Sequence, residues 1–348
     1  MAGLLMPWTL PGPAAFVARV CGVADREKVA VLHAPFMGKA LAEALRCHLE
    51  RDGLYSVQPL LLDAQNGCES LATQVGLGRA SPAALATSAM LEHSAIVVRN
   101  SGPADPDLAT FARMIRRQPP GQGPILLVVS EDGGCVLDGH AVAPVRDAFG
   151  PLDGAAYAAT VPTGLRPLER RLVAAVAIEV AAWDVALLDR LMALQLVQAV
   201  RPDLYVESWD EDGTSRWIGV ARTWESGCVD EWGGEPAEHA LWLAANRPEG
   251  LAKRVWRGQL AMLLPWIEQY RQMIIEREWR YLRPDPRSGT DVESLDWGPL
   301  SIQLDRVPAV KDLAAAFRFA RNELAHGRPI KWDRIKRCLE AARAYSGK

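Results

Sequence analysis

Short apolar runs alternate with longer amphipathic segments along the first half of the chain. The runs have the length and the β-branched content of buried parallel strands. The strand candidates are Val29–His33, Ser56–Leu62, Ala95–Val98 and Ile125–Val129. The segments between them repeat apolar residues at the i, i+3 and i+4 spacing of helices. The helix candidates are Gly38–Asp52, Pro82–His93 and Pro106–Arg117. This alternation predicts βαβ units and a parallel sheet with helices on both faces.

The second half of the chain carries helical spacing with little sign of strands. Leu168–Ala199 predicts a long helix that breaks near Trp183, and Leu251–Leu282 predicts another that Pro265 kinks or divides. Ala309–Ala325 and Trp332–Tyr345 predict two final helices. We therefore expect an α/β fold followed by an all-α fold. The expected domains are a parallel-sheet domain over residues 1–165, a helical and tryptophan-rich connecting region over 166–235, and a helical domain over 236–348.

Composition places the chain among globular proteins. It has 348 residues, of which 49% are hydrophobic and 23% charged, with a formal net charge of −3, which excludes disordered, collagen-like and strongly basic chains. The six cysteines form no CxxC pair, so we expect neither a disulfide framework nor a zinc site, and no cofactor. Residues 1–20 have no charged leader pattern, and no long apolar stretch follows. We expect a cytoplasmic protein without a membrane partner.

The charge is unevenly distributed along the chain. Residues 1–250 carry 20 Lys and Arg against 30 Asp and Glu, a net −10, whereas residues 251–348 carry 19 against 12, a net +7. A basic C-terminal third is what contact with a polyanion would require, because phosphates are bound mainly by arginine and lysine. A chance excess of basic residues on solvated helices would produce the same count.

The first predicted strand leads into a segment in the position of a phosphate-binding loop. This segment reads His33-Ala-Pro-Phe-Met-Gly38-Lys39-Ala40. Gly38 and Lys39 match a P-loop, whose glycines admit phosphate to the backbone and whose lysine contacts it, but His33 replaces the first glycine and Ala40 the magnesium-binding hydroxyl. The segment resembles the core of AAA and STAND ATPases after loss of the catalytic residues. The resemblance implies a non-hydrolysing scaffold or regulatory domain. Nucleotide binding through Gly38 and Lys39 and an unrelated α/β fold are the alternatives.

Reactive side chains gather at the end of the predicted helix Ala309–Ala325. The segment reads Arg321-Asn-Glu-Leu-Ala-His326, and Asn322 and His326 have the i, i+4 spacing of one helix face. Arg321 lies five positions before His326, and we expect both to reach one cleft if the helix end frays. A histidine can transfer protons near neutral pH, arginine can stabilise charge on a phosphorane, and asparagine can orient the imidazole. This set of groups is sufficient for RNA cleavage without a metal.

The segment from Arg321 to Ile330, with Arg321, Asn322 and His326 as the matching positions, resembles the ribonuclease motif of the HEPN superfamily of helical domains. The resemblance covers residues 236–348 and implies a HEPN-type endoribonuclease that cuts RNA, with tRNA as one candidate. It also implies a homodimer in which two motifs line one site. Members of the superfamily serve in prokaryotic antiphage defence and in toxin–antitoxin pairs. A partner ATPase or effector encoded in the same operon is a further expectation.

A purely structural interpretation of this motif stays open. A histidine at a helix end often serves as a C-terminal cap, and an arginine there is often an exposed cation. In that case the two domains would form an inactive scaffold or regulatory subunit that docks a partner ATPase or effector.

Overall fold

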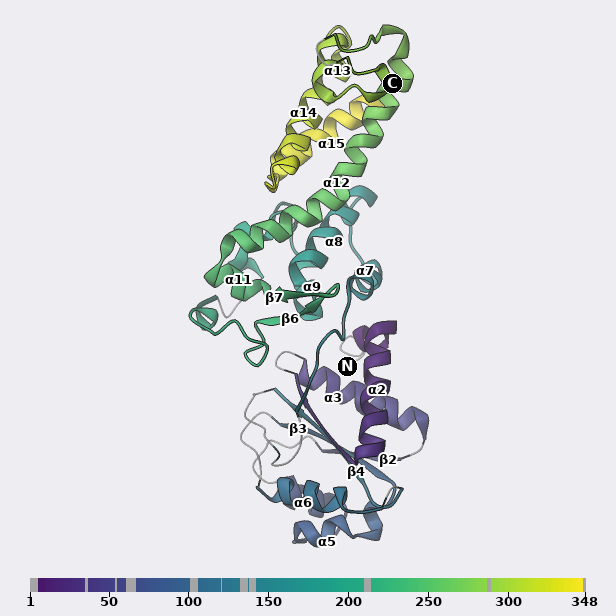
Figure 1. The fold of residues 1–348 in the computed structure, drawn as a ribbon, viewed down its shortest axis with the longest axis vertical. Coiled ribbons are helices and arrows are strands. Elements are labelled where there is room, and N and C mark those ends of the chain that lie inside the picture. Colours follow the sequence, from purple (N-terminus) through teal and green to yellow (C-terminus); the bar gives the residue numbers. More distant parts are fainter. Residues whose placement is uncertain are drawn as a thin grey trace. The chain divides into compact units, whose positions relative to one another are not determined.

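The computed structural model describes residues 6–34, 37–53, 55–60, 67–100, 106–119, 121–131, 137, 142–209, 214–286 and 289–346. The chain is mixed α/β (Figure 1) and forms two compact units. The first unit is Met1–Tyr157 with Val220–His239, and the second is Ala158–Gly219 with Ala240–Lys348. The expected connecting region 166–235 is thus divided between the two units. Among the described residues, no helix is long and apolar enough to cross a membrane.

A parallel sheet forms the centre of the first unit. Its five strands lie in the order β2-β3-β4-β1-β5, with β1 between β4 and β5. The strands are β1 (Val29–His33), β2 (Ser56–Leu60), β3 (Ser94–Asn100), β4 (Ile125–Ser130) and β5 (Val142–Pro144). Every residue of β1 and of β4 is buried, as continuous apolar strands in a covered parallel sheet should be. The four predicted strands are confirmed, whereas β5 is an addition.

Helices account for most of the other residues that the structure describes in the first unit. They are α2 (Pro11–Glu27), α3 (Gly38–Asp52), α4 (Gly67–Gln74), α5 (Pro82–Ala86) and α6 (Pro106–Arg116), with the 3-10 turns η1 (Met6–Thr9) and η2 (Ala89–Leu91). The predicted helix over 82–93 divides into α5 and η2, because Ser81 and Ser88 each cap a helical start of their own. α7 (Pro151–Thr160) ends this part of the chain.

An antiparallel hairpin returns to the first unit after part of the second has been completed. It consists of β6 (Val229–Trp232) and β7 (Glu235–Glu238). Gly233 and Gly234 both have positive φ, at 63° and 84°, which is what a two-residue hairpin turn requires. A Gly-Gly pair is a general turn signal, but the flanking strands are too short and too polar for an alternation of apolar and polar residues to identify them.

The second unit is helical. Its helices are α8 (Pro167–Ala181), α9 (Val185–Met192), α10 (Leu196–Ala199), α11 (Ala240–Asn246), α12 (Pro248–Glu278), α13 (Trp297–Gln303), α14 (Pro308–Ala325) and α15 (Trp332–Ser346). Its 3-10 turns are η3 (Pro202–Leu204), η4 (Val206–Ser208), η5 (Thr214–Trp217), η6 (Trp279–Tyr281) and η7 (Val292–Ser294). The predicted break near Trp183 is confirmed, because Asp184 caps α9 by accepting a hydrogen bond from the Leu187 N–H at 2.9 Å.

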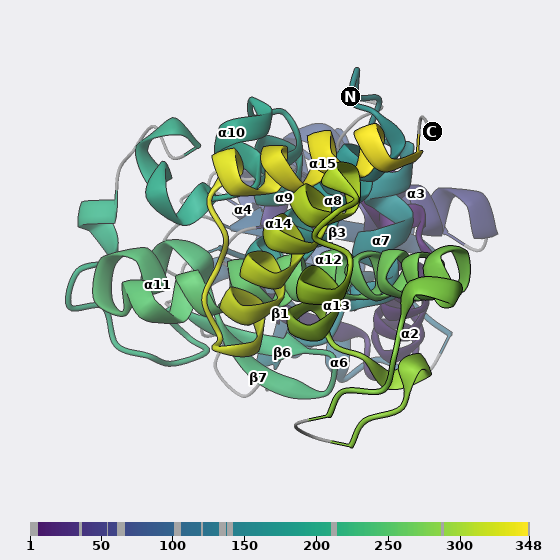
Figure 2. The same ribbon diagram turned by 90° about the horizontal axis from the view of Figure 1, so that it is seen from above.

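α12 contacts several other helices of the second unit. It packs on α8 and α14, and α14 in turn packs on α13 and α15 (Figures 1 and 2). Pro265 lies inside α12 and does not start a new helix, although the ribbon changes direction part-way along its length (Figure 1). A Cβ added at Gly258 would lie 2.7 Å from the carbonyl oxygen of Ala175, so this glycine permits the close approach of α12 to α8.

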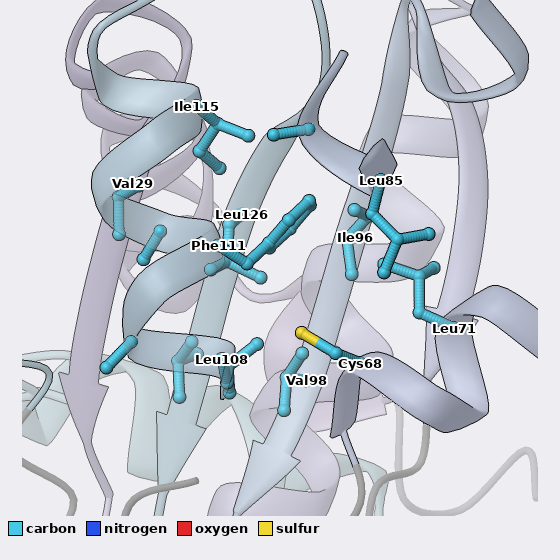
Figure 3. Close-up of a cluster of buried hydrophobic side chains, with 14 of the residues drawn as sticks. Val29, Cys68, Leu71, Leu85, Ile96, Val98, Leu108, Phe111, Ile115 and Leu126 are labelled. Carbon is cyan, nitrogen blue, oxygen red and sulfur yellow. The ribbon is translucent and has the colours of Figure 1, made fainter. Parts of the chain in front are cut away.

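Each unit has its own hydrophobic core. In the first, α4, α5 and α6 cover one face of the sheet, and Figure 3 shows Phe111 and Ile115 of α6 beside Leu126 and Ile96 of the strands. In the second, the aromatic ring of Phe317 on α14 packs against the rings of Trp266, Tyr270 and Trp297. These cores orient the ends of β1 and α14, where the sequence places its candidate sites.

Candidate functional site

The segment Arg321–His326 forms the C-terminal end of α14, and its backbone is tightly capped. Gly327 has a φ of 73°. The N–H of Arg328 donates to the Glu323 carbonyl at 2.9 Å, and the N–H of Gly327 donates to the Leu324 carbonyl at 3.2 Å. These two bonds make a Schellman cap, in which His326 is the C-cap residue. The helix end is therefore capped rather than frayed.

Two side chains of α12 clamp the turn between α14 and α15. The indole Nε1 of Trp256 donates to the Leu324 carbonyl at 2.7 Å. Gln259 is fully buried; its Nε2 donates to the carbonyls of Val200 at 2.8 Å and Ile330 at 2.9 Å, and its Oε1 accepts from the Ile330 N–H at 2.6 Å. The candidate residues thus stand on a backbone that buried hydrogen bonds hold in place.

The candidate side chains divide between two sides of α14. Asn322 and His326, four residues apart, lie on the exposed side of the helix. Arg321 lies five residues before His326, about 140° away around the helix axis. Its guanidinium forms an ion pair with Asp296 at 3.5 Å and is 40% exposed. One copy of the chain therefore does not place Arg321 and His326 on the same side of α14, contrary to the expectation of a shared cleft.

Asn322 and His326 are open to solvent. Within the described part of the chain, neither side chain has a hydrogen-bond or ion-pair partner. The backbone N–H of His326 caps the helix by donating to the Asn322 carbonyl at 3.0 Å, but the imidazole takes no part in that cap. A purely structural role as a helix cap therefore explains the backbone of His326 but gives its imidazole ring no function.

Basic side chains surround this end of α14. Arg328 is exposed and lies 3.7 Å from the Glu323 carboxylate. Lys331, just before α15, and Arg334 and Arg337 within it are exposed. Residues 321–337 carry six Arg and Lys against two Asp and Glu, a net +4, and a surface ion pair such as Arg328–Glu323 is weak in water. The region can attract a polyanion and present two polar side chains to it.

The second candidate site, at the start of α3, is already filled. Gly38 is buried and Lys39 is exposed. A Cβ added at Gly38 would lie 2.6 Å from Oε1 of Glu131, the residue that follows β4. The same oxygen lies 3.6 Å from Nε of Arg99 on β3. The glycine thus makes room for a carboxylate of the chain itself, and a negative charge occupies the space beside the helix start where a phosphate would bind.

His33 is the last residue of β1, and other parts of the first unit cover its side chain. The side chain is only 3% exposed, and its Nε2 lies 3.1 Å from the Glu225 carbonyl oxygen. Because a carbonyl can only accept, Nε2 carries the proton in this bond. The ring of Trp224 packs edge-on against the imidazole at 4.9 Å, and the guanidinium of Arg146 lies 5.0 Å from the Trp224 ring. The segment before the hairpin thus covers the position of the first P-loop glycine.

Asp230 on β6 is a titratable group that sequence reasoning did not single out. Burial raises its pKa to about 6, against partial compensation by hydrogen bonds from the backbone N–H groups of Glu231 and Asp147. No pattern in the sequence marks this residue, because its burial depends on the return of the hairpin to the first unit. We therefore expect the stability of the hairpin to depend on pH.

Known proteins provide no further guidance: no family model matches the chain, and no curated protein or solved structure matches it. The assignment of a function therefore depends on the chemistry of the two helix ends. Of these, the end of α14 has two exposed polar groups, Asn322 and His326, whereas at the start of α3 Lys39 is exposed but Glu131 lies against Gly38.

Proposed function

We propose that this chain is a metal-independent HEPN-type endoribonuclease in prokaryotic antiphage defence or a toxin-type system. The observation that supports the proposal is the exposed pair Asn322 and His326 on a backbone that Trp256 and Gln259 clamp. Catalytic groups need such preorganised support, because small displacements reduce the rate strongly.

The proposed chemistry uses only groups that the chain supplies. The 2′-hydroxyl of RNA attacks the adjacent phosphorus, the bond from phosphorus to the 5′-oxygen breaks, and the products carry a 2′,3′-cyclic phosphate and a 5′-hydroxyl. The imidazole of His326 takes the proton of the 2′-hydroxyl or delivers one to the leaving oxygen. Asn322 donates to a phosphate oxygen or orients the imidazole. The guanidinium of Arg321 stabilises the charge that develops on the phosphorane.

A homodimer would complete the proposed site. In one copy Arg321 is turned toward Asp296 and away from His326. Two copies that meet along their exposed α14 surfaces would bring two histidines and two asparagines to one RNA strand. The resemblance to HEPN proteins implies this arrangement, and Arg321 would reach the RNA only after it leaves Asp296.

The sheet unit would then regulate the site without hydrolysing nucleotide. Glu131 against Gly38 and Ala40 in place of a hydroxyl are the features that support this role. We expect calorimetry to detect no ATP binding to the unmodified chain. ATP binding that a Lys39→Ala substitution weakens would instead assign the first unit as a nucleotide sensor.

The decisive experiment is RNA cleavage by the purified full chain, alone and with any operon partner, on tRNA and mixed cellular RNA in EDTA. His326→Ala should reduce the cleavage rate by about a hundredfold to ten-thousandfold, the range that general acid–base groups contribute. His48→Ala, which removes a histidine of α3, serves as the control. The products should carry 5′-hydroxyl ends. Equal cleavage by the chain and by His326→Ala would exclude the proposed function.

An inactive scaffold is the second candidate, and the ion pair of Arg321 with Asp296 favours it. An arginine held by a carboxylate is not available to a phosphorane in that position. If the scaffold interpretation is correct, His326→Ala preserves the biological phenotype, and substitution of the exposed side chains that bind a partner ATPase or effector abolishes it.

A further inference from the structure

A small recess lies between α14 and α15 on the exposed side of the second unit. It has a volume of about 180 Å³, and its lining consists of Ala315, Ala316, Phe319, Arg334 and Arg337. Two small residues of α14 leave the space open. Phe319 is 40% exposed, an unusual position for a large aromatic side chain in a helix that otherwise buries its apolar face.

The recess combines an aromatic ring with two positive charges. The guanidinium carbon of Arg334 lies 4.7 Å from the centre of the Phe319 ring, and Arg337 follows one helical turn later. No acidic side chain contributes to the lining, and among the described residues neither arginine forms an ion pair. Like charges three residues apart on a helix repel each other and destabilise it slightly, so the pair has no evident structural benefit.

The recess lies on the same side of α14 as the candidate catalytic residues. Phe319, Asn322 and His326 follow at spacings of three and four residues, which is the spacing of one helix face. Seven residues separate Phe319 from His326, or about 10 Å along the helix axis. An extended RNA strand that lies over the recess can therefore continue to His326.

We propose that this recess binds one base of a single-stranded RNA, with the base stacked on the Phe319–Arg334 pair and the adjoining phosphate on Arg337. This inference rests on the proposed ribonuclease function and names the contact that positions the strand. The volume is below that of pockets for drug-sized ligands, roughly 300 Å³ or more, and so suits a single planar group with the rest of the nucleotide outside. Stacking on an aromatic ring and phosphate contact by arginine are the two interactions by which proteins bind single strands without strict sequence preference.

Binding of fluorescein-labelled single-stranded oligouridine, followed by anisotropy in the non-cleaving His326→Ala background, tests the recess. Phe319→Leu keeps an apolar side chain but removes the ring, and it should weaken binding about tenfold or more. Arg337→Gln should weaken binding and reduce the slope of log K against log salt by about 0.7, the loss of one phosphate contact. Arg343→Gln is the matched control, because it removes the same charge from α15 at a position that pairs with Glu169 instead.

Several outcomes would overturn the inference. They are an absence of oligouridine binding, unchanged binding by Phe319→Leu and Arg337→Gln, and an equal loss in Arg343→Gln. Displacement of the RNA by polyglutamate as readily as by unlabelled oligouridine would instead assign the recess to an acidic protein segment. If His326→Ala abolishes cleavage while Phe319→Leu binds normally, the recess inference alone fails. If the recess variants lose binding while His326→Ala still cleaves, the proposed function alone fails.

Discussion

The sequence marks two helix ends, the start of α3 and the end of α14, as candidate sites for phosphate chemistry. The surroundings of these two ends differ in the structure. At the start of α3, Glu131 fills the space beside Gly38, and His33 is covered by Trp224. At the end of α14, Asn322 and His326 remain exposed on a clamped turn. The difference teaches that residue types identify what a site could do, whereas the neighbouring side chains decide whether a ligand has room to enter.

The largest expected effect tests the clamp at α14. Gln259→Leu would leave the Ile330 N–H and two buried carbonyls without partners, and each such group costs about 1–3 kcal/mol. We expect the free energy of unfolding to fall by about 3 kcal/mol or more in urea denaturation. Gln272→Leu, an exposed position of the same helix, should change it little. A loss of less than about 1 kcal/mol would contradict the view that the clamp holds the turn.

A smaller effect tests the hairpin that closes the sheet unit. The pKa of Asp230 rises from 3.8 to about 6, so the folded state holds its proton more tightly than the unfolded state does. The unfolding free energy should therefore fall as pH rises from about 4 through 6. Asp230→Asn should match the unmodified chain at pH 4 and exceed its stability at pH 7 by up to about 3 kcal/mol. Denaturation at both pH values measures this.

Glu235→Gln, an exposed acid of the same hairpin, provides the reference for Asp230→Asn. It should leave the pH dependence unchanged. A parallel shift of Asp230→Asn at both pH values would mean that burial of this carboxyl does not cause the dependence.

The contact between Gly38 and Glu131 can be tested by a double-mutant cycle. Gly38→Ala alone should cost about 1 kcal/mol, because the new methyl group displaces Glu131 from Arg99. In a Glu131→Ala background the same substitution should cost nothing, so the coupling energy should be about 1 kcal/mol. Additive effects of the two substitutions would show that Glu131 does not fill the space beside Gly38.

The smallest effect on stability addresses Arg321. Asp296→Asn should change the unfolding free energy by less than about 0.5 kcal/mol, because the ion pair is exposed and asparagine also caps α13. Its expected consequence is functional: release of Arg321 should increase RNA cleavage. Cleavage that falls to the level of an Arg321→Ala variant would show that the pair positions the arginine for catalysis.

Local pattern was sufficient for most of the secondary structure. Apolar periodicity predicted β1 and α3 with their observed bounds and α14 to within one residue, since burial on one face and backbone hydrogen bonding are properties of consecutive residues. β5 has only three residues, and the hairpin strands are polar, so neither carries enough periodicity to be recognised. Of the two alternatives for Pro265, the division of the helix is wrong, because α12 continues through this residue and its packing on α8 and α14 overrides the local penalty.

The features of the candidate site also divide into those that the sequence predicts and those that depend on tertiary packing. The residue types and the i, i+4 spacing of Asn322 and His326 follow from the sequence alone, as does the glycine that caps α14. The ion pair of Arg321, the filling of the space at Gly38 and the clamp by Gln259 each join residues far apart in the chain. Contacts of this kind depend on how the helices and strands pack, and no local pattern records them. Packing therefore determined which of the two helix ends stays open to a ligand.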